Sequence, residues 1–387
     1  MLIFVFCSTH LLIFYLLFES VLIPMFILVG IWGSRERKIF ASKQLLLYTL
    51  FGSLFVLNAI IYFLLNNGSA DINIINSVIL EPEVEFILWS LFFFGFCIKV
   101  PMMPFHLWLP EAHVEAPTAG SVLLAGVVLK LGSYGFVRFL IYLWPFISLY
   151  FIPLVFLLAT ISVIFGSLIT LRQIDIKKII AYSSVVHMNF SLLGLFSFSL
   201  PGLLGGLIAT LSHGFVSSGL FLSVGVLYER YHSRLLKYYG GIAQLMPFFS
   251  VFFFFLTLGN ISFPFTLNFL GEFLIILGLF YKNLILAVLN VFSLVLSTIY
   301  AFWLMNRLLF GQIKLFTIKL NITNLLTIFN TIKLQRYWTT KLIDTNEREQ
   351  FIFIPLIIIT FFTGIITDFP IFTLFLPLLV NYTINFF

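Results

Sequence analysis

The stretch KVPMMPFHLWLPEAHVEAPTAG, residues 99–120, decides how the chain is interpreted. It places one lysine, two histidines, two glutamates and four prolines within 22 residues, in a chain that is 61% hydrophobic and only 9% charged. Long apolar runs lie on both sides of it. Because about a quarter of the residues in a soluble domain are charged, so many polar groups in so apolar a chain require an explanation.

The composition predicts an all-α, polytopic membrane protein. A helix needs about 20 apolar residues to cross the hydrocarbon core, at a rise of 1.5 Å per residue. The net charge of +6 does not indicate nucleic-acid binding, because the basic residues lie in loops without interleaved aromatic residues. Apolar windows predict ten transmembrane spans, two of them interrupted: 10–32, 44–65, 86–115 (interrupted), 117–141, 149–171, 177–198, 202–229, 246–280 (interrupted), 285–310 and 351–369.

The basic residues are distributed unevenly between the two sides of this arrangement. If the spans alternate in direction, four loops on one side contain 17 of the 21 lysines and arginines: 33–43, 172–178, 229–238 and 306–350. Membrane proteins show this bias toward the inner side. The asymmetry supports the number of spans, because a missed or invented helix would disrupt the alternation.

Six ionisable residues lie within the predicted spans. A charge at the bilayer centre costs roughly 2.5–3.5 kcal/mol on insertion scales, so such residues tend to be paired and functional. Both signs are present, which suits a proton relay between partners of opposite charge. Either histidine alone is explained equally well by a hydrogen bond between helices. The six residues are Glu19, Lys99, Lys130, His187, His213 and Glu272.

Proline interrupts two spans beside ionisable residues of opposite sign. Lys99 is followed by VPMMP, and Glu272 is preceded by GNISFPFTLNF. Proline removes an internal helical hydrogen bond, and irregular backbone at membrane depth is tolerated only where protein or a water-filled cavity satisfies it. Broken helices in corresponding positions of two halves indicate a transport pathway between inverted repeats. The two breaks are about five spans apart, as two repeats of five helices would place them.

These repeats predict one membrane domain over residues 1–387. Residues 1–141 are expected to belong to a first repeat, and residues 149–310 to a second repeat. Residues 311–350 connect the second repeat to residues 351–387, which hold the last helix and a tail. Apolar residues at roughly helical spacing in the connection favour an amphipathic surface helix over a loosely ordered linker.

A metal site within the opening stretch is a weak alternative. Its ligands would be His106, Glu111, His113 and Glu115, but their spacing matches no common zinc pattern. Pro110 also interrupts the helix that would align these side chains. We expect no metal here, and we expect the four residues to line an inner entrance or, as the favoured interpretation, to fasten the turn between two spans.

Several stretches of the chain resemble the antiporter-like subunits of respiratory complex I. The resemblance covers residues 10–314 and 350–369, and within the family YERYHSR and HMNFSLLG favour the chain 4 branch over the chain 2 and chain 5 branches. The matching stretches are KVPMMPFHLWLPEAHVEAPTAGSVLLAGVVLKLGSYGFVRF, FESVLIPMFILVGIWG, LRQIDIKKIIAYSSVVHM, ATLSHGFVSSGLFLSVGVLYERYHSR and LNFLGEF.

The resemblance implies a role for each of the six ionisable residues. Glu19 matches the carboxylate that pairs with the lysine of the broken helix, and Lys99 matches that lysine. The other four match, in chain order, the second lysine of the path, two central relay residues and a terminal acidic residue: Lys130, His187, His213 and Glu272. The implied proton path follows this chain order toward the outer side, driven by electron transfer elsewhere in the complex.

The resemblance also implies the setting of the chain. No cofactor is expected in the chain itself, since NADH, FMN, iron–sulfur clusters and ubiquinone belong to other subunits of the complex. The expected partners are other membrane-arm subunits, including neighbouring antiporter-like chains, and membrane lipid. High Phe and Ile usage without a targeting segment suits an organelle-encoded, multi-pass protein of the mitochondrial inner membrane.

The chain also departs from the family pattern, and other functions stay open. Family members carry fourteen spans and this chain begins where their fifth starts, so about four N-terminal helices are expected to be missing. A separate polypeptide supplies them or they are dispensable, two explanations favoured equally over replacement by other subunits. The alternative functions are a subunit of a multi-subunit sodium/proton antiporter and a truncated structural scaffold of the membrane arm. Retention of the six ionisable residues argues against the scaffold.

Overall fold

The computed structural model describes residues 1–78, 80–312 and 344–366, and nearly all of this part of the chain is helical. Within these ranges the only β pairing consists of two isolated bridges, His10–Asp71 and Asp175–Leu235. The all-α prediction is therefore confirmed. Most of the predicted surface connection, residues 313–343, and the predicted tail from residue 367 onward lie outside the described residues.

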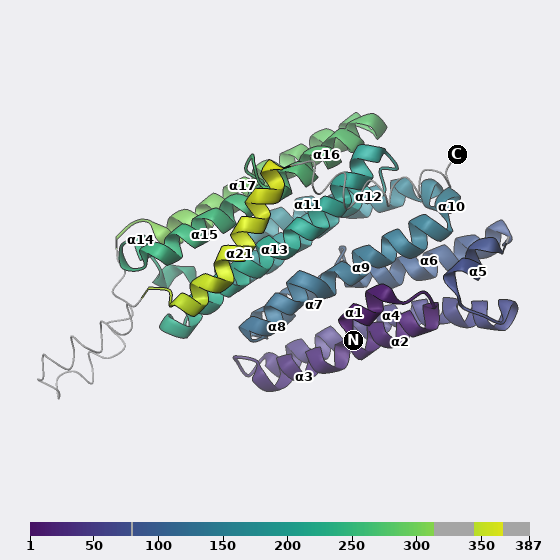
Figure 1. The fold of residues 1–387 in the computed structure, drawn as a ribbon, viewed down its shortest axis with the longest axis horizontal. Helices are drawn as coiled ribbons and strands as arrows, with labels where there is room; N and C mark the ends of the chain where they lie inside the picture. Colours follow the sequence, from purple (N-terminus) through teal and green to yellow (C-terminus); the bar gives the residue numbers. More distant parts are fainter. Residues whose placement is uncertain (79, 313–343, 367–387) are drawn as a thin grey trace, which may run out of the picture.

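The first group of helices forms one side of the molecule (Figure 1). It consists of α1 (Leu2–Cys7), α2 (Leu11–Ser20), α3 (Leu22–Trp32), α4 (Lys38–Asn67), α5 (Ile72–Ser77), α6 (Pro82–Lys99), α7 (Trp108–Glu115), α8 (Thr118–Leu123), α9 (Leu129–Gly135) and α10 (Pro145–Tyr150). Two π-helical segments, η1 (Leu124–Val128) and η2 (Phe136–Ile141), continue α8 and α9.

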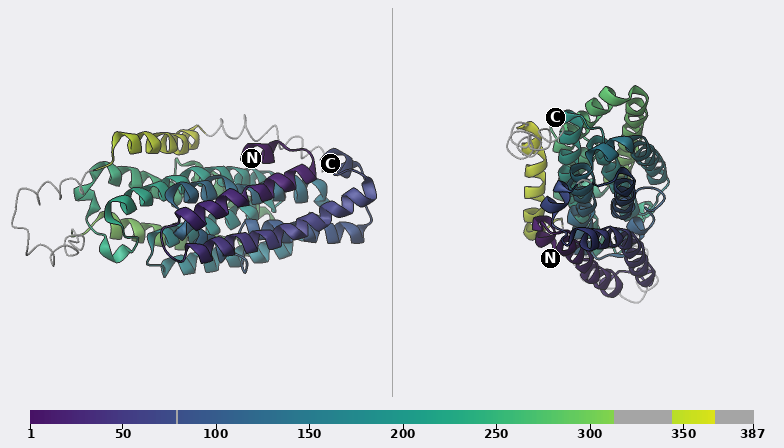
Figure 2. Two further views of the ribbon diagram at one scale, coloured as in Figure 1. Left: turned by 90° about the horizontal axis from the view of Figure 1, so that it is seen from below. Right: turned by 90° about the vertical axis from the view of Figure 1, so that its right-hand side faces the viewer.

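The second group lies beside the first, with its long helices running in nearly the same direction (Figures 1 and 2). It consists of α11 (Ile152–Leu171), α12 (Ile176–Leu195), α13 (Leu200–Tyr231), a short turn η3 (Leu236–Tyr238), α14 (Ile242–Leu245), α15 (Pro247–Asn260), α16 (Leu267–Lys282), α17 (Leu284–Leu309) and α21 (Glu347–Ile365). The last helix, α21, lies across the outside of this group (Figure 1).

All ten predicted spans are found as helical segments. Seven segments are long and apolar enough to cross a membrane: 11–32, 38–67, 118–141, 152–171, 200–231, 284–309 and 347–365. The other three correspond to α6 with α7, to α12, and to α15 with α16. Both predicted interruptions are present. The division of these helices into inverted repeats stays a prediction.

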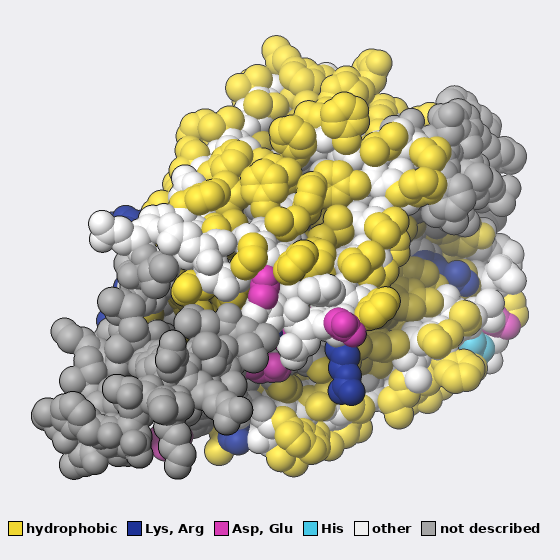
Figure 3. Space-filling view, turned by 60° about the vertical axis from the view of Figure 1, so that its left-hand side comes forward, with side chains coloured by type: hydrophobic (Ala, Val, Ile, Leu, Met, Phe, Trp, Pro, Cys, Tyr) yellow, Lys and Arg dark blue, Asp and Glu magenta, His cyan; other side chains and the backbone are white. Residues whose placement is uncertain are grey.

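Hydrophobic side chains cover most of the face seen in Figure 3. Many large ones are exposed, including Phe146, Phe292 and Ile285, as expected of a surface that faces lipid. The interior of the first group is built from phenylalanine rings. Phe14 and Phe139 lie 4.7 Å apart edge to face, an arrangement that aromatic pairs favour. These rings hold α2 against η2 and so position the residues near Lys99.

Candidate proton-transfer site

The first helix break follows Lys99, where α6 ends, and α7 resumes only at Trp108. Its backbone groups are hydrogen-bonded by side chains of the second group of helices. The Met103 amide donates to Ser162 Oγ of α11 (2.8 Å), and Asn189 Nδ2 of α12 donates to the carbonyl oxygen of Pro101 (3.2 Å). Irregular backbone at membrane depth is therefore satisfied by protein, as it must be.

Lys99 is buried in the last turn of α6, with 2% of its surface exposed. Its ammonium lies 4.1 Å from the centroid of the Phe18 ring, close enough for a cation–π interaction. Among the described residues it makes no hydrogen bond. The negative end of the α6 dipole also favours a cation at this position. Phe18 is a contact that sequence reasoning missed, although it precedes Glu19 directly.

Glu19 lies on α2, half-buried, in the residue after Phe18. It interacts electrostatically with Lys99. No ion pair within 4.0 Å joins the two in the described parts of the chain, and Glu19 Oε1 accepts no hydrogen bond there. The pair implied by the resemblance is thus an interaction between neighbouring charges, with the Phe18 ring against the lysine, and not a closed salt bridge.

Lys130 lies on α9, where it is 8% exposed. Its ammonium donates a hydrogen bond to the Ala125 carbonyl oxygen and lies 2.9 Å from His213 Nδ1. Ala125 belongs to η1, where the π-helical turn shifts the backbone hydrogen bonds by one residue. The sequence predicts an unbroken helix over residues 117–141, and the π-helical turn at η1 is a departure from that prediction. A π-turn has no reliable sequence signal, so this acceptor could not be predicted.

His213 of α13 and His187 of α12 continue the contacts from Lys130. Their ring centroids are 5.8 Å apart, and His187 Nδ1 lies 3.1 Å from Glu272 Oε1 of α16. All three side chains are at least nine-tenths buried. The contact order is therefore Lys130, His213, His187 and Glu272, which differs from the chain order expected from the resemblance. The reason is that the packed helices place His213 of α13 next to Lys130 and His187 of α12 next to Glu272.

The two lysines stand on adjacent helices without a direct contact between them. Gly132 of α9 faces the end of α6, where a Cβ atom would lie 3.1 Å from Lys99 Cβ and 2.5 Å from Val100 Cγ2. Only glycine allows this approach. The structure thus brings Lys130, both histidines and Glu272 into one series of contacts, and it places Lys99 and Glu19 beside that series.

The charged residues of the opening stretch fasten the turn between α7 and α8. Glu111 pairs with Lys178 at 2.9 Å, and the buried Glu115 lies 3.8 Å from Arg234. Arg234 also donates to the carbonyl of Val114. Burial lowers the pKa of Arg234 from its ordinary value, while nearby carboxylates oppose the shift. The favoured interpretation of these glutamates, as a fastening of the turn, agrees with this geometry.

The two histidines of that stretch have separate surroundings. His113 is fully buried and stacks on the Phe221 ring of α13, with centroids 4.6 Å apart and planes 4° apart. His106 lies in the first break, 6.2 Å from the Tyr182 ring of α12. Among the described residues, no three histidine, cysteine, aspartate or glutamate side chains lie so that they could hold a metal ion, and Glu111 and Glu115 each have a cationic partner.

The second break separates α15, which ends at Asn260, from α16, which begins at Leu267. Ser262 and Phe265 adopt left-handed backbone conformations, with φ of 60° and 74°, which are strained for residues with a side chain. Asn268 of α16 closes the break by donating to the Gly259 carbonyl oxygen (2.7 Å). The break therefore sets the start of the helix that carries Glu272.

The model of the NADH:quinone oxidoreductase/Mrp antiporter transmembrane family matches residues 8–299. The chain belongs to this family. It is 50% identical over 361 residues to NADH-ubiquinone oxidoreductase chain 4 of Marchantia polymorpha, an alignment that covers 93% of this chain and 69% of the relative. The resemblance to the chain 4 branch is therefore confirmed.

Two solved structures of family members share the fold. A chain in respiratory complex I from Thermus thermophilus with bound NADH superposes with a TM-score of 0.82 and 28% identity, covering 94% of this chain and 72% of that one. A chain of the Mrp complex from Dietzia sp. superposes with a TM-score of 0.74 and 21% identity, covering 79% and 58%. The Mrp likeness shows the fold alone.

Proposed function

We propose that six buried or half-buried ionisable side chains carry and control protons in this chain: Glu19, Lys99, Lys130, His213, His187 and Glu272. The chain is a subunit of proton-translocating NADH-ubiquinone oxidoreductase, since it belongs to the chain 4 branch of the family. One observation carries the assignment of the residues. It is the run of contacts from Lys130 through His213 and His187 to Glu272.

Proton transfer along this run needs no group from outside the chain at its two ends. The Lys130 ammonium, already directed at His213 Nδ1, gives its proton to that nitrogen. His213 releases a proton from its other ring nitrogen, Nε2, to the His187 ring, whose Nε2 has no other partner among the described residues. His187 then gives its Nδ1 proton to the Glu272 carboxylate. Both end contacts, 2.9 and 3.1 Å, are within the reach of direct proton transfer.

Lys99 and Glu19 act as the control on this path. When Glu19 is ionised, it stabilises the charged form of Lys99 by electrostatic attraction. We propose that a charged Lys99 in turn repels a proton on Lys130, because Gly132 brings α9 close to the end of α6 and like charges in a low-dielectric interior repel. A change in the charge at Glu19 therefore changes how readily Lys130 holds its proton. Moving one charge against a membrane potential of 100 mV requires about 2.3 kcal/mol. Interactions between neighbouring charges in a low-dielectric interior are of comparable energy.

The wider setting follows from the same assignment. The redox cofactors of the oxidoreductase are carried by other subunits, and we propose NADH, FMN, iron–sulfur clusters and ubiquinone as these groups. The partners are membrane-arm subunits, among which we propose neighbouring antiporter-like chains. The chain is membrane-embedded, and we propose the mitochondrial inner membrane as its location. A separate chain that supplies further helices stays a prediction.

The two alternative functions receive less support. A subunit of a sodium/proton antiporter would share this fold, but the antiporter likeness is 21% identical and concerns the fold alone. Identity of 50% to chain 4 separates the two. A purely structural scaffold would have no need of four buried ionisable residues in one series of contacts.

The test is proton pumping by the intact oxidoreductase that contains Lys99→Ala or Glu272→Gln, reconstituted in vesicles. We expect a lower number of protons pumped per electron in both variants. The matched controls are Lys282→Ala, an exposed lysine at the end of α16, and Glu36→Gln, an exposed glutamate before α4. Both controls are expected to pump normally. An unchanged number of protons pumped per electron in assembled Lys99→Ala and Glu272→Gln complexes would contradict the roles proposed for these two residues.

A further inference from the structure

The last helix, α21, is packed against α15 and against the break that follows it. It contacts α13, α15 and α16, and it lies across them in Figure 1. Nearly all of its side chains are exposed or only partly buried, and Phe353 and Thr360 are buried against the bundle. Nothing in the proposed proton path uses this helix, yet both of its ends are held.

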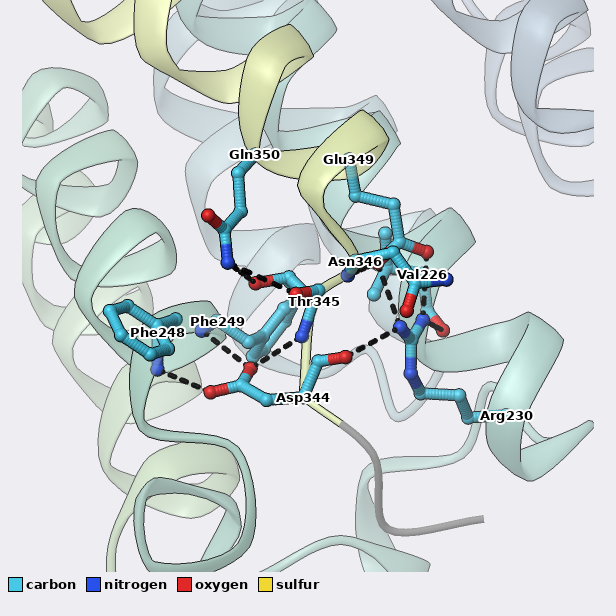
Figure 4. Close-up of polar contacts among 9 residues, drawn as sticks. All are labelled: Val226, Arg230, Phe248, Phe249, Asp344, Thr345, Asn346, Glu349 and Gln350. Carbon is cyan, nitrogen blue, oxygen red and sulfur yellow. Dashed lines mark hydrogen bonds and ion pairs between the residues drawn. The ribbon is translucent and has the colours of Figure 1, made fainter. Parts of the chain in front are cut away.

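The N-terminal end of α21 is fixed by Arg230, the last basic residue of α13 (Figure 4). Its guanidinium donates to both carboxylate oxygens of Glu349, at 3.0 and 2.7 Å. Glu349 Oε2 also accepts from the Asn346 amide in a capping box. Two parallel hydrogen bonds between arginine and a carboxylate fix orientation as well as distance. This end of α21 is therefore held against the end of α13.

Asp344, three residues before the start of α21, caps α15. The Asp344 carboxylate accepts hydrogen bonds from the amides of Phe248 and Phe249, in the first turn of α15, at 2.6 and 3.0 Å (Figure 4). A carboxylate at a helix N-terminus is stabilised by the free amides and by the helix dipole. The start of α15 and the start of α21 are thus joined through one side chain.

The C-terminal end of α21 lies against the second break. At Gly364, an added Cβ atom would be 2.4 Å from the Phe265 carbonyl oxygen, 2.5 Å from the Thr266 carbonyl carbon and 2.8 Å from the Leu267 amide nitrogen. These are backbone atoms, which cannot move aside as a flexible side chain does. Thr266 caps α16, and Leu267 is its first residue. Gly364 therefore touches the point where the helix that carries Glu272 begins.

Ring contacts connect the two fixed ends. Phe353 of α21 stacks on Phe252 of α15 at 5.4 Å, and Phe361 meets Phe255 edge to face at 5.5 Å. The contacts of α21 thus extend from the capped start of α15 to the break after it. A helix held in this way resists any displacement of the break relative to α15.

We infer that α21 sets the geometry of the second break and thereby the position of Glu272 opposite His187. In this role we call α21 a strut, and Gly364 is its positioning residue. This rests on the proposed function of Glu272. Glu272 follows Leu267 by five residues, about 7.5 Å along a rigid helix, so a displacement at the break moves the carboxylate. Because a misplacement of about 1 Å can slow a reaction 100-fold, the contact of 3.1 Å with His187 is sensitive to this displacement.

The experiment uses the intact oxidoreductase with Gly364→Ala, measured for protons pumped per electron and for the pH profile of pumping. We expect a lower ratio, a changed pH profile and a longer separation between His187 Nδ1 and Glu272 Oε1 in a structure of the assembled variant. Gly30→Ala is the matched control, because its added methyl group would lie 3.4 Å or more from its neighbours. An assembled Gly364→Ala complex with an unchanged ratio, or a lowered ratio with the His187–Glu272 contact intact, would overturn the inference.

If the Gly364→Ala complex fails to assemble, proton pumping by the Glu349→Gln complex tests the inference instead. It weakens the other end of the strut without added bulk, and we expect a smaller loss in the same direction; an unchanged ratio would overturn the inference. The double variant with Glu272→Gln separates the two proposals. If Glu272→Gln alone lowers the ratio, Gly364→Ala should add nothing to it. If Glu272→Gln alone pumps normally, the proposed function itself fails.

Discussion

Both helix breaks are closed by a side chain of the helix that follows, but among the described residues only the first is shown to be bonded by side chains of other helices as well. Trp108 of α7 donates to the Ile98 carbonyl oxygen of α6 (2.9 Å). Ser162 and Asn189 come from α11 and α12 to satisfy the first break. At the second, Asn268 closes the break from α16 itself, and Gly364 of α21 covers it. The first break therefore depends on how the two groups of helices meet in addition to its local bond, and the second depends on local sequence and one covering helix.

The ionisable residues beside the breaks differ in the same way. Lys99 precedes its break, at the negative end of a helix, with an aromatic ring against it and no hydrogen bond among the described residues. Glu272 follows its break and is hydrogen-bonded to His187. A charge without a fixed partner can respond to a change at Glu19. A charge with a fixed partner suits the receiving end of the path.

The largest effect is expected where α16 meets α13. In Gly205→Ala the new methyl group would lie 2.7 Å from the Gly271 carbonyl oxygen and from the Ile275 amide nitrogen, both backbone atoms of α16. Overpacking costs typically about 1–3 kcal/mol and occasionally more, and we expect little assembled complex on a native gel. Gly132→Ala at the first break should be milder, because the nearest atom there belongs to the Val100 side chain. Equal assembly of the two variants would contradict the comparison.

The next effect tests the bond between the first break and α12. Asn189→Leu removes the donor to the Pro101 carbonyl, and a buried acceptor left without a partner costs about 1–3 kcal/mol. We expect a lower melting temperature of the complex. Asn290→Leu is the matched control, since this buried asparagine bonds only a carbonyl of its own helix, that of Leu286. If both variants melt at the same temperature, the break does not depend on α12.

A smaller effect is expected from the ring beside Lys99. Phe18→Leu removes the cation–π interaction, worth about 0.5–2 kcal/mol, so we expect slower proton pumping with normal assembly. Phe14→Leu, one turn away on α2, removes a buried ring that packs on Phe139 and not on Lys99. Equal pumping rates in Phe18→Leu and Phe14→Leu complexes would show that the ring has no special effect on the lysine.

The smallest effect is expected at the pair that joins α7 to α12. Glu111 and Lys178 are partly exposed, with 23% and 27% of their side-chain surfaces accessible, and such pairs contribute about 0–1 kcal/mol. Glu111→Gln should lower the melting temperature slightly, and the difference should disappear at high salt. Glu115→Gln is the comparison, since it leaves the buried Arg234 without its carboxylate and should cost more. A larger effect at Glu111 would reverse this order.

The sequence by itself determined the features that depend on local composition. Runs of apolar residues predicted the spans, because hydrocarbon requires about 20 of them in succession. Pro101 and Pro264 lie within the two breaks, as the loss of a helical hydrogen bond at proline requires. The six ionisable residues were found because a charge among apolar residues is costly and is therefore conspicuous.

The tertiary structure alone decided how these residues meet. The order Lys130, His213, His187 and Glu272 depends on which helix packs between which others, and chain order does not encode it. The same is true of contacts between residues far apart in the chain: Phe18 with Lys99, Arg234 with Glu115, and Gly364 with the second break. Hydropathy and proline act over a few neighbouring residues, whereas these contacts arise only when packed helices bring distant side chains within a few ångströms.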